Sequence, residues 1–170
     1  MCITSSRGEL VLSMTLNAEL IEQYYSEKYN TPTTSRKDIG DIYVDGIPWN
    51  IKSNNLDKQN YSPNLISADK LFDHLTSGNS LKFLFVDYRD DSIVNERLVE
   101  VHHISWKCLS IQCQGNGVIQ ISSDLIVNES QTKEEFLEEL RGAYVTYIDK
   151  QRVKLDKLSV KYTMELLLSN

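Results

Sequence analysis

Two short runs of β-branched and aromatic residues, joined by an Asp45-Gly46 pair, occupy residues 41–53. An Asp-Gly pair between such runs predicts a tight β-hairpin, because both residues tolerate the backbone angles that this turn requires. Amphipathic spacing predicts a helix before the hairpin, over residues 16–29, and another after it, over residues 63–75. The chain therefore begins with a helix, a hairpin and a second helix.

The remaining segments predict further strands and a long closing helix. Residues 81–88 are apolar and aromatic enough for a buried strand, and residues 97–104 and 117–121 fit shorter strands. Residues 132–164 fit one long helix or two joined helices that begin with a capping box. With no Gly/Ser/Pro-rich linker in the 170 residues, we expect a single domain, 1–170. The element order predicts an α/β fold in which a mixed β-sheet is flanked by helices.

Composition restricts the class of partner only loosely. Eighteen Lys and Arg against 24 Asp and Glu give a net charge of −6, which does not indicate a nucleic-acid-binding protein but leaves room for a local basic surface. No run is long and apolar enough for a membrane span, and the amino terminus does not resemble a secretory signal. The three cysteines form neither a disulfide framework nor a zinc-binding pattern. We therefore expect a cytoplasmic protein with no membrane partner.

The hairpin carries the pattern with the clearest chemistry. Asp41 begins its first strand, and Asn50 and Lys52 lie two residues apart on the second. Because side chains alternate along a strand, Asn50 and Lys52 share one face, and Asp41 can meet them across the hairpin. A carboxylate, an amide oxygen and the Ile51 carbonyl are hard donors that suit Mg²⁺, and a nearby ammonium can orient a metal-bound water. The pattern suits hydrolysis of a phosphodiester; a surface hairpin with ordinary polar residues is the alternative.

The order of several segments resembles the PD-(D/E)-x-K nuclease superfamily, and more narrowly the HincII-type restriction endonucleases. Residues 40–43 (GDIY) resemble the first acidic strand of that family, and residues 50–52 (NIK) its second acid and lysine. Residues 59–71 (QNYSPNLISADKL) resemble the loop and helix with which it reaches base edges. Residues 83–88 are similar to its next core strand, residues 117–121 to its closing strand, and residues 133–150 to its last helix. The resemblance implies a restriction-endonuclease-like α/β fold.

The resemblance also implies a type II restriction endonuclease that cuts double-stranded DNA with Mg²⁺, or with Mn²⁺ as a possible substitute. Cutting both strands of a twofold-symmetric site asks for two active sites, so a homodimer is expected. Asp41, Asn50 and the Ile51 carbonyl would ligate the metal, and Lys52 would position the attacking water. Asn50 stands where the family has an acid, so the metal should bind more weakly unless another acid supplies the missing charge. The candidates for that acid are Glu19, Glu22, Asp38 and Asp45.

Three groups of polar residues are candidate DNA contacts. By the resemblance, the loop residues Gln59, Asn60 and Tyr61 and the following Asn64 would reach base edges, since amide side chains pair bidentately with adenine. Asn64 equally fits a helix cap. Lysines spaced four, three and four residues apart on the last helix could follow a phosphate backbone, although an ordinary solvated face gives the same spacing. These lysines are Lys150, Lys154, Lys157 and Lys161; a second amide-rich stretch, which also fits a polar turn, contains Gln112, Gln114, Asn116 and Gln120.

Three other functions fit the same chain. A DNA-binding or subunit-pairing relative of this fold with little catalysis would explain Asn50. A junction resolvase or repair nuclease could use the same scaffold. A globular α/β protein without a nucleic-acid function is the remaining alternative.

Overall fold

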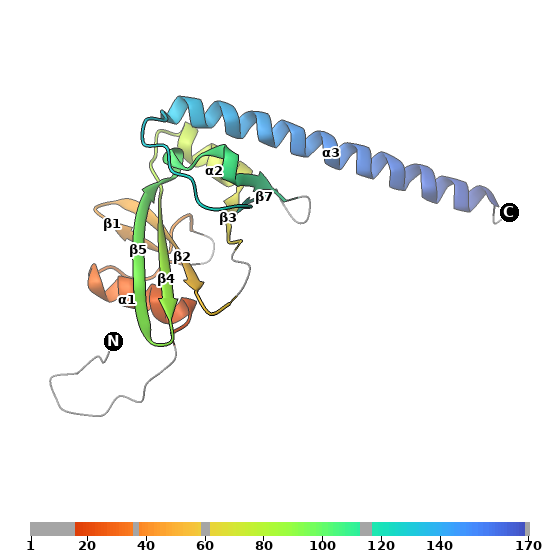
Figure 1. The fold of residues 1–170 in the computed structure, drawn as a ribbon. Helices are drawn as coiled ribbons and strands as arrows, with labels where there is room; N and C mark the ends of the chain where they lie inside the picture. The colour runs from red at the N-terminus through yellow and green to blue at the C-terminus, as the bar shows by residue number, and fades with distance from the viewer. Residues whose placement is uncertain (1–15, 36–37, 59–61, 113–116, 169–170) are drawn as a thin grey trace, which may run out of the picture.

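The computed structural model describes residues 16–35, 38–58, 62–112 and 117–168 (Figure 1). The elements follow in the order α1 (Ala18–Lys28), β1 (Ile42–Val44), β2 (Ile47–Asn55), β3 (Asn64–Ser67), α2 (Ala68–Thr76), β4 (Lys82–Arg89) and β5 (Ser92–Glu100). Two short 3₁₀ turns, η1 (Val101–His103) and η2 (Trp106–Cys108), lead to β6 (Leu109–Ile111), β7 (Val118–Ile121) and α3 (Lys133–Leu168).

Two sheets organise these strands. The larger sheet has the order β1-β2-β4-β5, in which β2 and β4 are parallel and the other pairs antiparallel. The smaller sheet, β3-β7-β6, is antiparallel. The predicted α/β class with a mixed sheet and flanking helices is therefore confirmed.

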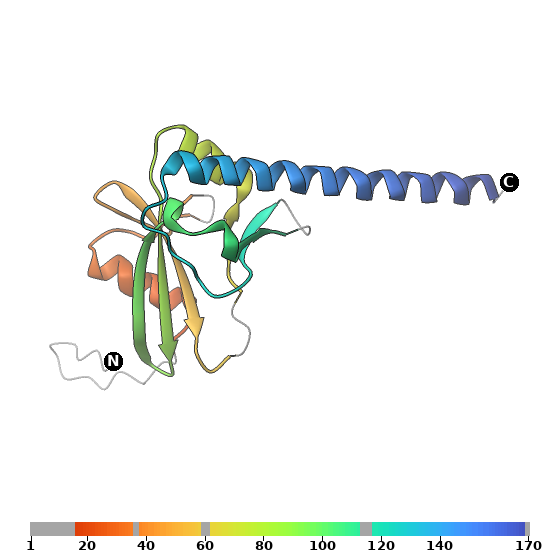
Figure 2. The same ribbon diagram turned by 45° about the horizontal axis from the view of Figure 1, so that its top comes forward.

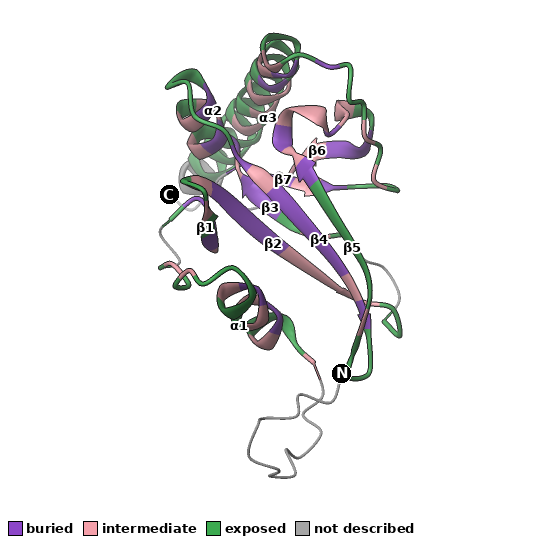
Figure 3. Cartoon of the chain, turned by 90° about the vertical axis from the view of Figure 1, so that its left-hand side faces the viewer, coloured by how far each residue is buried: buried purple, intermediate pink, exposed green. Residues whose placement is uncertain are grey.

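Alternate residues of the central strands belong to two separate cores, one on each face of the larger sheet. Figure 3 shows β4 and the first half of β2 coloured largely as buried. Helix α1 covers one face of the larger sheet, where its Ile21 packs with Ile51 of β2. Helix α2, the smaller sheet and the first turns of α3 cover the other face, where Phe83 of β4 packs with Phe136 of α3. The side chain of Ile51 thus enters the layer opposite to its neighbours Asn50 and Lys52, as the strand periodicity predicts.

Local sequence signals correctly predict several element ends. Asn17 caps α1 by accepting the Leu20 N–H at 3.0 Å. The hairpin turns at Asp45 and Gly46, whose φ angles are 51° and 77°. Helix α3 begins with a reciprocal capping box, in which Thr132 N–H donates to Glu135 Oε2 at 2.8 Å and Glu135 N–H donates to Thr132 Oγ1 at 3.2 Å.

The helix predicted over residues 63–75 is wrong in its first turn. Residues Asn64–Ser67 form β3, which pairs with β7, and α2 begins only at Ala68. Leu65 and Ile66 are buried here, and an apolar pair of this kind fits a strand as well as a helix. Asn64 therefore begins a strand and does not cap a helix.

Other strand boundaries also differ from the prediction. The strand expected over residues 97–104 ends at Glu100 and begins earlier, at Ser92, because it completes a hairpin with β4. Strand β2 extends to Asn55, two residues beyond the runs over residues 41–53 that predict the hairpin. Its polar residue Asn54 is accommodated because its Nδ2 donates to Asp87 Oδ1 on β4 at 2.8 Å.

Helix α3 is a single helix of 36 residues that is only partly supported by the rest of the molecule (Figure 2). Its first turns contact α2, η1 and β6. Tyr144 and Tyr147, stacked on each other, lie close to Gly117 on the loop before β7, where a Cβ would come within 3.2 Å of both rings. Beyond these tyrosines the helix projects away from the two sheets (Figures 1 and 2). Within the described residues, no helix has the length and apolar character of a membrane span.

Candidate active site

Asp41 is held at the edge of β2 by the main chain of the hairpin. Its N–H donates to the Trp49 carbonyl at 2.7 Å, and its Oδ2 accepts the Ile51 N–H at 2.6 Å. In a strand, the N–H and C=O of one residue point to the same neighbouring strand. The Ile51 carbonyl therefore faces the edge where the Asp41 carboxylate lies, and both groups present oxygen atoms that can ligate a metal on that edge.

Gly40 makes this close approach sterically possible. A Cβ at this position would lie 2.8 Å from Pro48 Cβ and 3.0 Å from Trp49 N, both closer than ordinary contact. The preceding loop also fixes the strand entry, because Thr34 N–H donates to the Asp41 carbonyl at 2.9 Å. Glycine at this position thus has a packing reason.

Asn50 is a buried amide whose oxygen has no hydrogen-bond partner in the described part of the chain. It is 9% exposed, and its Nδ2 donates to the Ile39 carbonyl at 3.2 Å. Its Oδ1 is buried and accepts no hydrogen bond from the described residues. A buried acceptor without a partner costs about 1–3 kcal/mol, so such an atom calls for an explanation. A cation bound beside this oxygen would satisfy it, because amide oxygens are ligands for hard cations.

Lys52 and Asp41 perturb each other within the same partly buried site. Burial lowers the pKa of Lys52, and the carboxylates of Asp41 and Glu22 oppose this shift. Burial raises the pKa of Asp41, against the effects of the Ile51 N–H, Lys52 and Lys70. Opposed shifts of this kind in an acid and a base that lie together are typical of functional sites.

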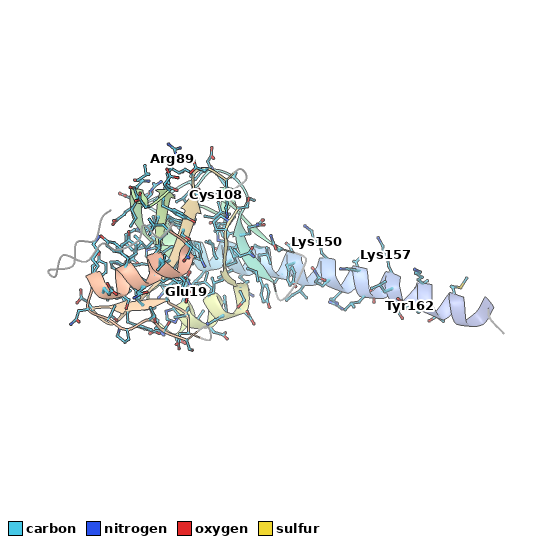
Figure 4. All side chains as sticks on the ribbon, turned by 90° about the horizontal axis from the view of Figure 1, so that it is seen from below. Glu19, Arg89, Cys108, Lys150, Lys157 and Tyr162 are labelled. Atoms are coloured by element: carbon cyan, nitrogen blue, oxygen red, sulfur yellow. The ribbon has the colours of Figure 1, made fainter. Side chains whose placement is uncertain are left out.

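Glu22 is the member of the four candidate acids whose charge acts on Lys52. Helix α1 presents it half-buried, whereas Glu19, one turn earlier, is exposed (Figure 4). Asp38 uses its Oδ2 to accept from the N–H and the hydroxyl of Ser35, at 2.9 and 3.0 Å. Asp45 lies exposed in the hairpin turn. The geometry therefore favours Glu22 as the acid that compensates for Asn50.

Lys70 is a site residue that sequence reasoning did not single out. It lies in the first turn of α2, and its Nζ donates to the Asp38 carbonyl at 2.6 Å. From there its charge also acts on Asp41. The sequence places Lys70 within the segment that resembles the family, but its approach to Asp41 depends on how β3 leads into α2.

The proposed DNA contacts lie in separate parts of the molecule. Gln59, Asn60 and Tyr61 are outside the described residues, as are residues 113–116 of the second amide-rich stretch. Asn64 is exposed and pairs with Gln120 of β7. The four lysines Lys150, Lys154, Lys157 and Lys161, which we call the lysine stripe, lie on the projecting part of α3, where Figure 4 shows Lys150 and Lys157. The structure therefore does not gather the four lysines around Asp41.

The donor set fits a hard divalent cation that is held weakly. Asp41 supplies a carboxylate, Asn50 an amide oxygen and Ile51 a carbonyl, which are ligand types that Mg²⁺ accepts together with several waters. Among the described residues there is no group of three or more His, Cys, Asp and Glu side chains placed for metal binding. Any metal here would therefore depend on one carboxylate and neutral oxygens.

No family model matches the chain, and no curated protein matches its sequence. The function is therefore inferred from the geometry and chemistry of the site.

Proposed function

We propose that the chain is a divalent-metal-dependent endonuclease that hydrolyses phosphodiester bonds of double-stranded DNA, in the manner of a type II restriction enzyme with a PD-(D/E)-x-K-like fold. The observation that carries the proposal is the buried Asn50 Oδ1, which has no hydrogen-bond partner among the residues that the structure describes, on the strand that holds Lys52 and pairs with the Asp41 segment. An ordinary surface hairpin would leave such an oxygen in water or hydrogen-bonded.

Each residue has a distinct role in this proposal. Asp41, Asn50 Oδ1 and the Ile51 carbonyl hold Mg²⁺ or Mn²⁺. When bound, the metal polarises the phosphate and lowers the pKa of a bound water. Lys52 orients the attacking water and offsets the negative charge that develops on the phosphate. Because the pKa of Lys52 is lowered, its neutral amine can accept the proton that the attacking water loses, and the ammonium group formed then offsets the charge on the phosphate.

Glu22 and Lys70 adjust the charge of the site. Asn50 removes one negative charge from the position of the second acid, and Glu22 restores one next to Lys52. Lys70 favours the ionised form of Asp41, which is the form that binds metal. A site with a single coordinating carboxylate should need a higher metal concentration than one with two.

The proposed enzyme acts in the cytoplasm as a homodimer, with one active site for each DNA strand. Asn64 and the neighbouring loop residues Gln59, Asn60 and Tyr61 contribute to base recognition, and the lysine stripe of α3 contacts phosphates. Specificity would then come from amide contacts, and affinity from lysines.

Plasmid cleavage tests the proposal. Supercoiled DNA of varied sequence is incubated with Mg²⁺ or Mn²⁺ and the wild-type chain, Asp41→Asn, Lys52→Ala or Lys107→Ala. Lys107 is an exposed lysine on η2 and is the matched control for Lys52. We expect discrete fragments with the wild-type chain and Lys107→Ala, and none with the other two variants. Equal cleavage by the wild-type chain and Lys52→Ala, or neither cleavage nor DNA binding, would contradict the proposal.

Asn50 favours a second candidate function, a DNA-binding relative with little catalysis. Loss of the second acid weakens metal binding, while the amide and lysine contacts to DNA remain. Binding of duplex DNA without cleavage in either metal would identify this function.

A further inference from the structure

The carboxyl-terminal half of α3 is a helix without support from the described part of its own chain. Phe136 and Leu140 are fully buried against the two sheets, and Tyr144 still packs at the edge of that core. From Arg152 to Met164 every side chain is exposed. The helix continues to Leu168, so about 30 Å of it projects beyond Ile148. Figures 1 and 2 show this arm standing clear of both sheets.

The arm is unusually apolar for an exposed helix. Eight of the fourteen large hydrophobic residues that are exposed in the described structure lie on the arm or on the turn of α3 just before it, between Val145 and Met164. Four of them follow a spacing of seven, three and four residues, which is the repeat of a coiled-coil seam. We call these four residues the seam: Ile148, Leu155, Leu158 and Tyr162. Exposed apolar seams of this kind mark protein interaction surfaces.

We infer that the seam pairs with the seam of a second copy of this chain, and that the two helices run antiparallel. The seam continues the face on which Tyr144 and Leu140 contact the chain's own core. A parallel partner helix on that face would bring its amino-terminal half into the space that this core fills. An antiparallel partner approaches from the carboxyl end, and each helix tip then stops near the other subunit's core.

The spacing of the seam fits this antiparallel register. A twofold axis between residues 156 and 157 places Leu155 opposite Leu158 of the partner subunit, and Tyr162 opposite Gln151 of the partner subunit. Ile148 then lies opposite Glu165 of the partner subunit, so the apolar contact is centred on Leu155 and Leu158. These pairs belong to one register, because opposed residues of an antiparallel pair have residue numbers with a constant sum, and all of these pairs give the same sum. A twofold pairing uses the same surface on both subunits, so no other partner is needed to cover the seam.

The same arrangement assigns a place to the lysine stripe. The lysines at positions 150, 154, 157 and 161 lie on one flank of the seam, about a third of a turn away. A twofold axis perpendicular to both helices keeps equivalent flanks on the same side of the pair. The two stripes therefore form one basic surface, in which Lys154 and the partner subunit's Lys161 approach each other. Contact of this surface with duplex DNA rests on the proposed function, but the pairing does not.

Sedimentation equilibrium of the full chain, without DNA or metal, tests the pairing. We compare the wild-type chain with Leu155→Asp and with the matched control Val153→Asp, since Val153 is 52% exposed on another face of the arm and Leu155 is 63% exposed. We expect a concentration-dependent dimer whose dissociation constant rises at least about tenfold in Leu155→Asp and stays near the wild-type value in Val153→Asp. A monomer at every concentration, or equal effects of the two substitutions, would overturn the inference.

Disulfide cross-linking tests the direction. Leu155→Cys and Leu158→Cys chains are oxidised separately and as a mixture, with the unchanged chain as the background for its native cysteines. The antiparallel pair predicts that the mixed cross-link dominates, whereas a parallel pair would favour cross-links within each variant. Salt gives a second readout: because it screens the apposed lysines, higher salt should strengthen the dimer. Dominant cross-links within one variant, or a dimer weakened by salt, would contradict the antiparallel arrangement. Because no DNA or metal is present, failure here leaves the proposed nuclease activity untouched.

Discussion

Replacement of Asn50 by aspartate tests whether this buried amide occupies a metal-ligand position. In the wild-type chain its Nδ2 donates to the Ile39 carbonyl at 3.2 Å, and its Oδ1 accepts no hydrogen bond from any residue that the structure describes. An aspartate loses the donor, places an oxygen against the Ile39 carbonyl and adds a second carboxylate to the buried neighbourhood of Asp41. We therefore expect Asn50→Asp to be less stable than the wild-type chain without metal, and to bind Mg²⁺ more tightly.

The size of the effect follows from the burial of the site. Asn50 is 9% exposed, so its replacement by a charged group in a metal-free protein costs about 3 kcal/mol, the lower end of the range for an uncompensated buried charge, because Lys52 offsets part of it. For a chain of this size, that corresponds to a decrease of about 6–12 °C in Tm. Saturation of the site with Mg²⁺ at about 100 times Kd returns roughly 2.7 kcal/mol.

Thermal unfolding in EDTA and over a Mg²⁺ titration measures both effects. Asn17→Asp is the control, because Asn17 is an exposed helix cap and aspartate caps a helix equally well. It changes the net charge by the same amount as Asn50→Asp, away from the site. If Asn50→Asp unfolded at the wild-type temperature in EDTA and gained no more from Mg²⁺ than the wild-type chain, Asn50 would not adjoin a metal site.

Three further predictions concern other parts of the molecule. Thr132→Ala removes the cap of α3 and should lower stability by about 1 kcal/mol, or about 2–4 °C in Tm. The control Glu138→Ala, at an exposed position of the same helix, should leave Tm unchanged. Equal Tm changes in the two variants would refute the capping role. Burial lowers the pKa of His102 from 6.5, so the unfolded state binds more protons and stability should decline as the pH falls below that value. Urea unfolding of His102→Gln should show a smaller loss of stability at low pH than the wild-type chain does. If the stability of both chains fell in parallel with pH, His102 would not be the group responsible. Lys154→Gln should reduce the salt slope of duplex binding by about 1.8, because each bound homodimer loses two lysine contacts, and Lys107→Gln should leave it unchanged; an unaltered slope in both would remove Lys154 from the phosphate contacts.

The centre of the candidate site could be predicted from the sequence because it depends on local geometry. Asp41, Asn50 and Lys52 lie on one hairpin, and the alternation of side chains together with the Asp-Gly turn fixes which of them can meet. The ends of α1 and α3 were predictable for the same reason, since each cap is made by residues within three positions of one another.

The rest of the site comes from contacts between distant segments, which periodicity does not encode. The charge of Glu22 acts on Lys52 because α1 packs across β2, and the charge of Lys70 acts on Asp41 because α2 follows a short strand. That strand was missed, since the burial of Leu65 and Ile66 fits helix and strand alike until β7 supplies a partner. Nor did the sequence show how much of α3 would lack a surface to pack against.

Binding of Mn²⁺, followed by electron paramagnetic resonance of the free ion, tests most directly whether Asp41, Asn50 and Ile51 form one metal site. We predict that the wild-type chain and Lys107→Ala each bind a single Mn²⁺, and that Asp41→Asn weakens this binding by at least about tenfold, or 1.4 kcal/mol. Equal Mn²⁺ binding by the wild-type chain and Asp41→Asn, or no binding by either, would contradict the account.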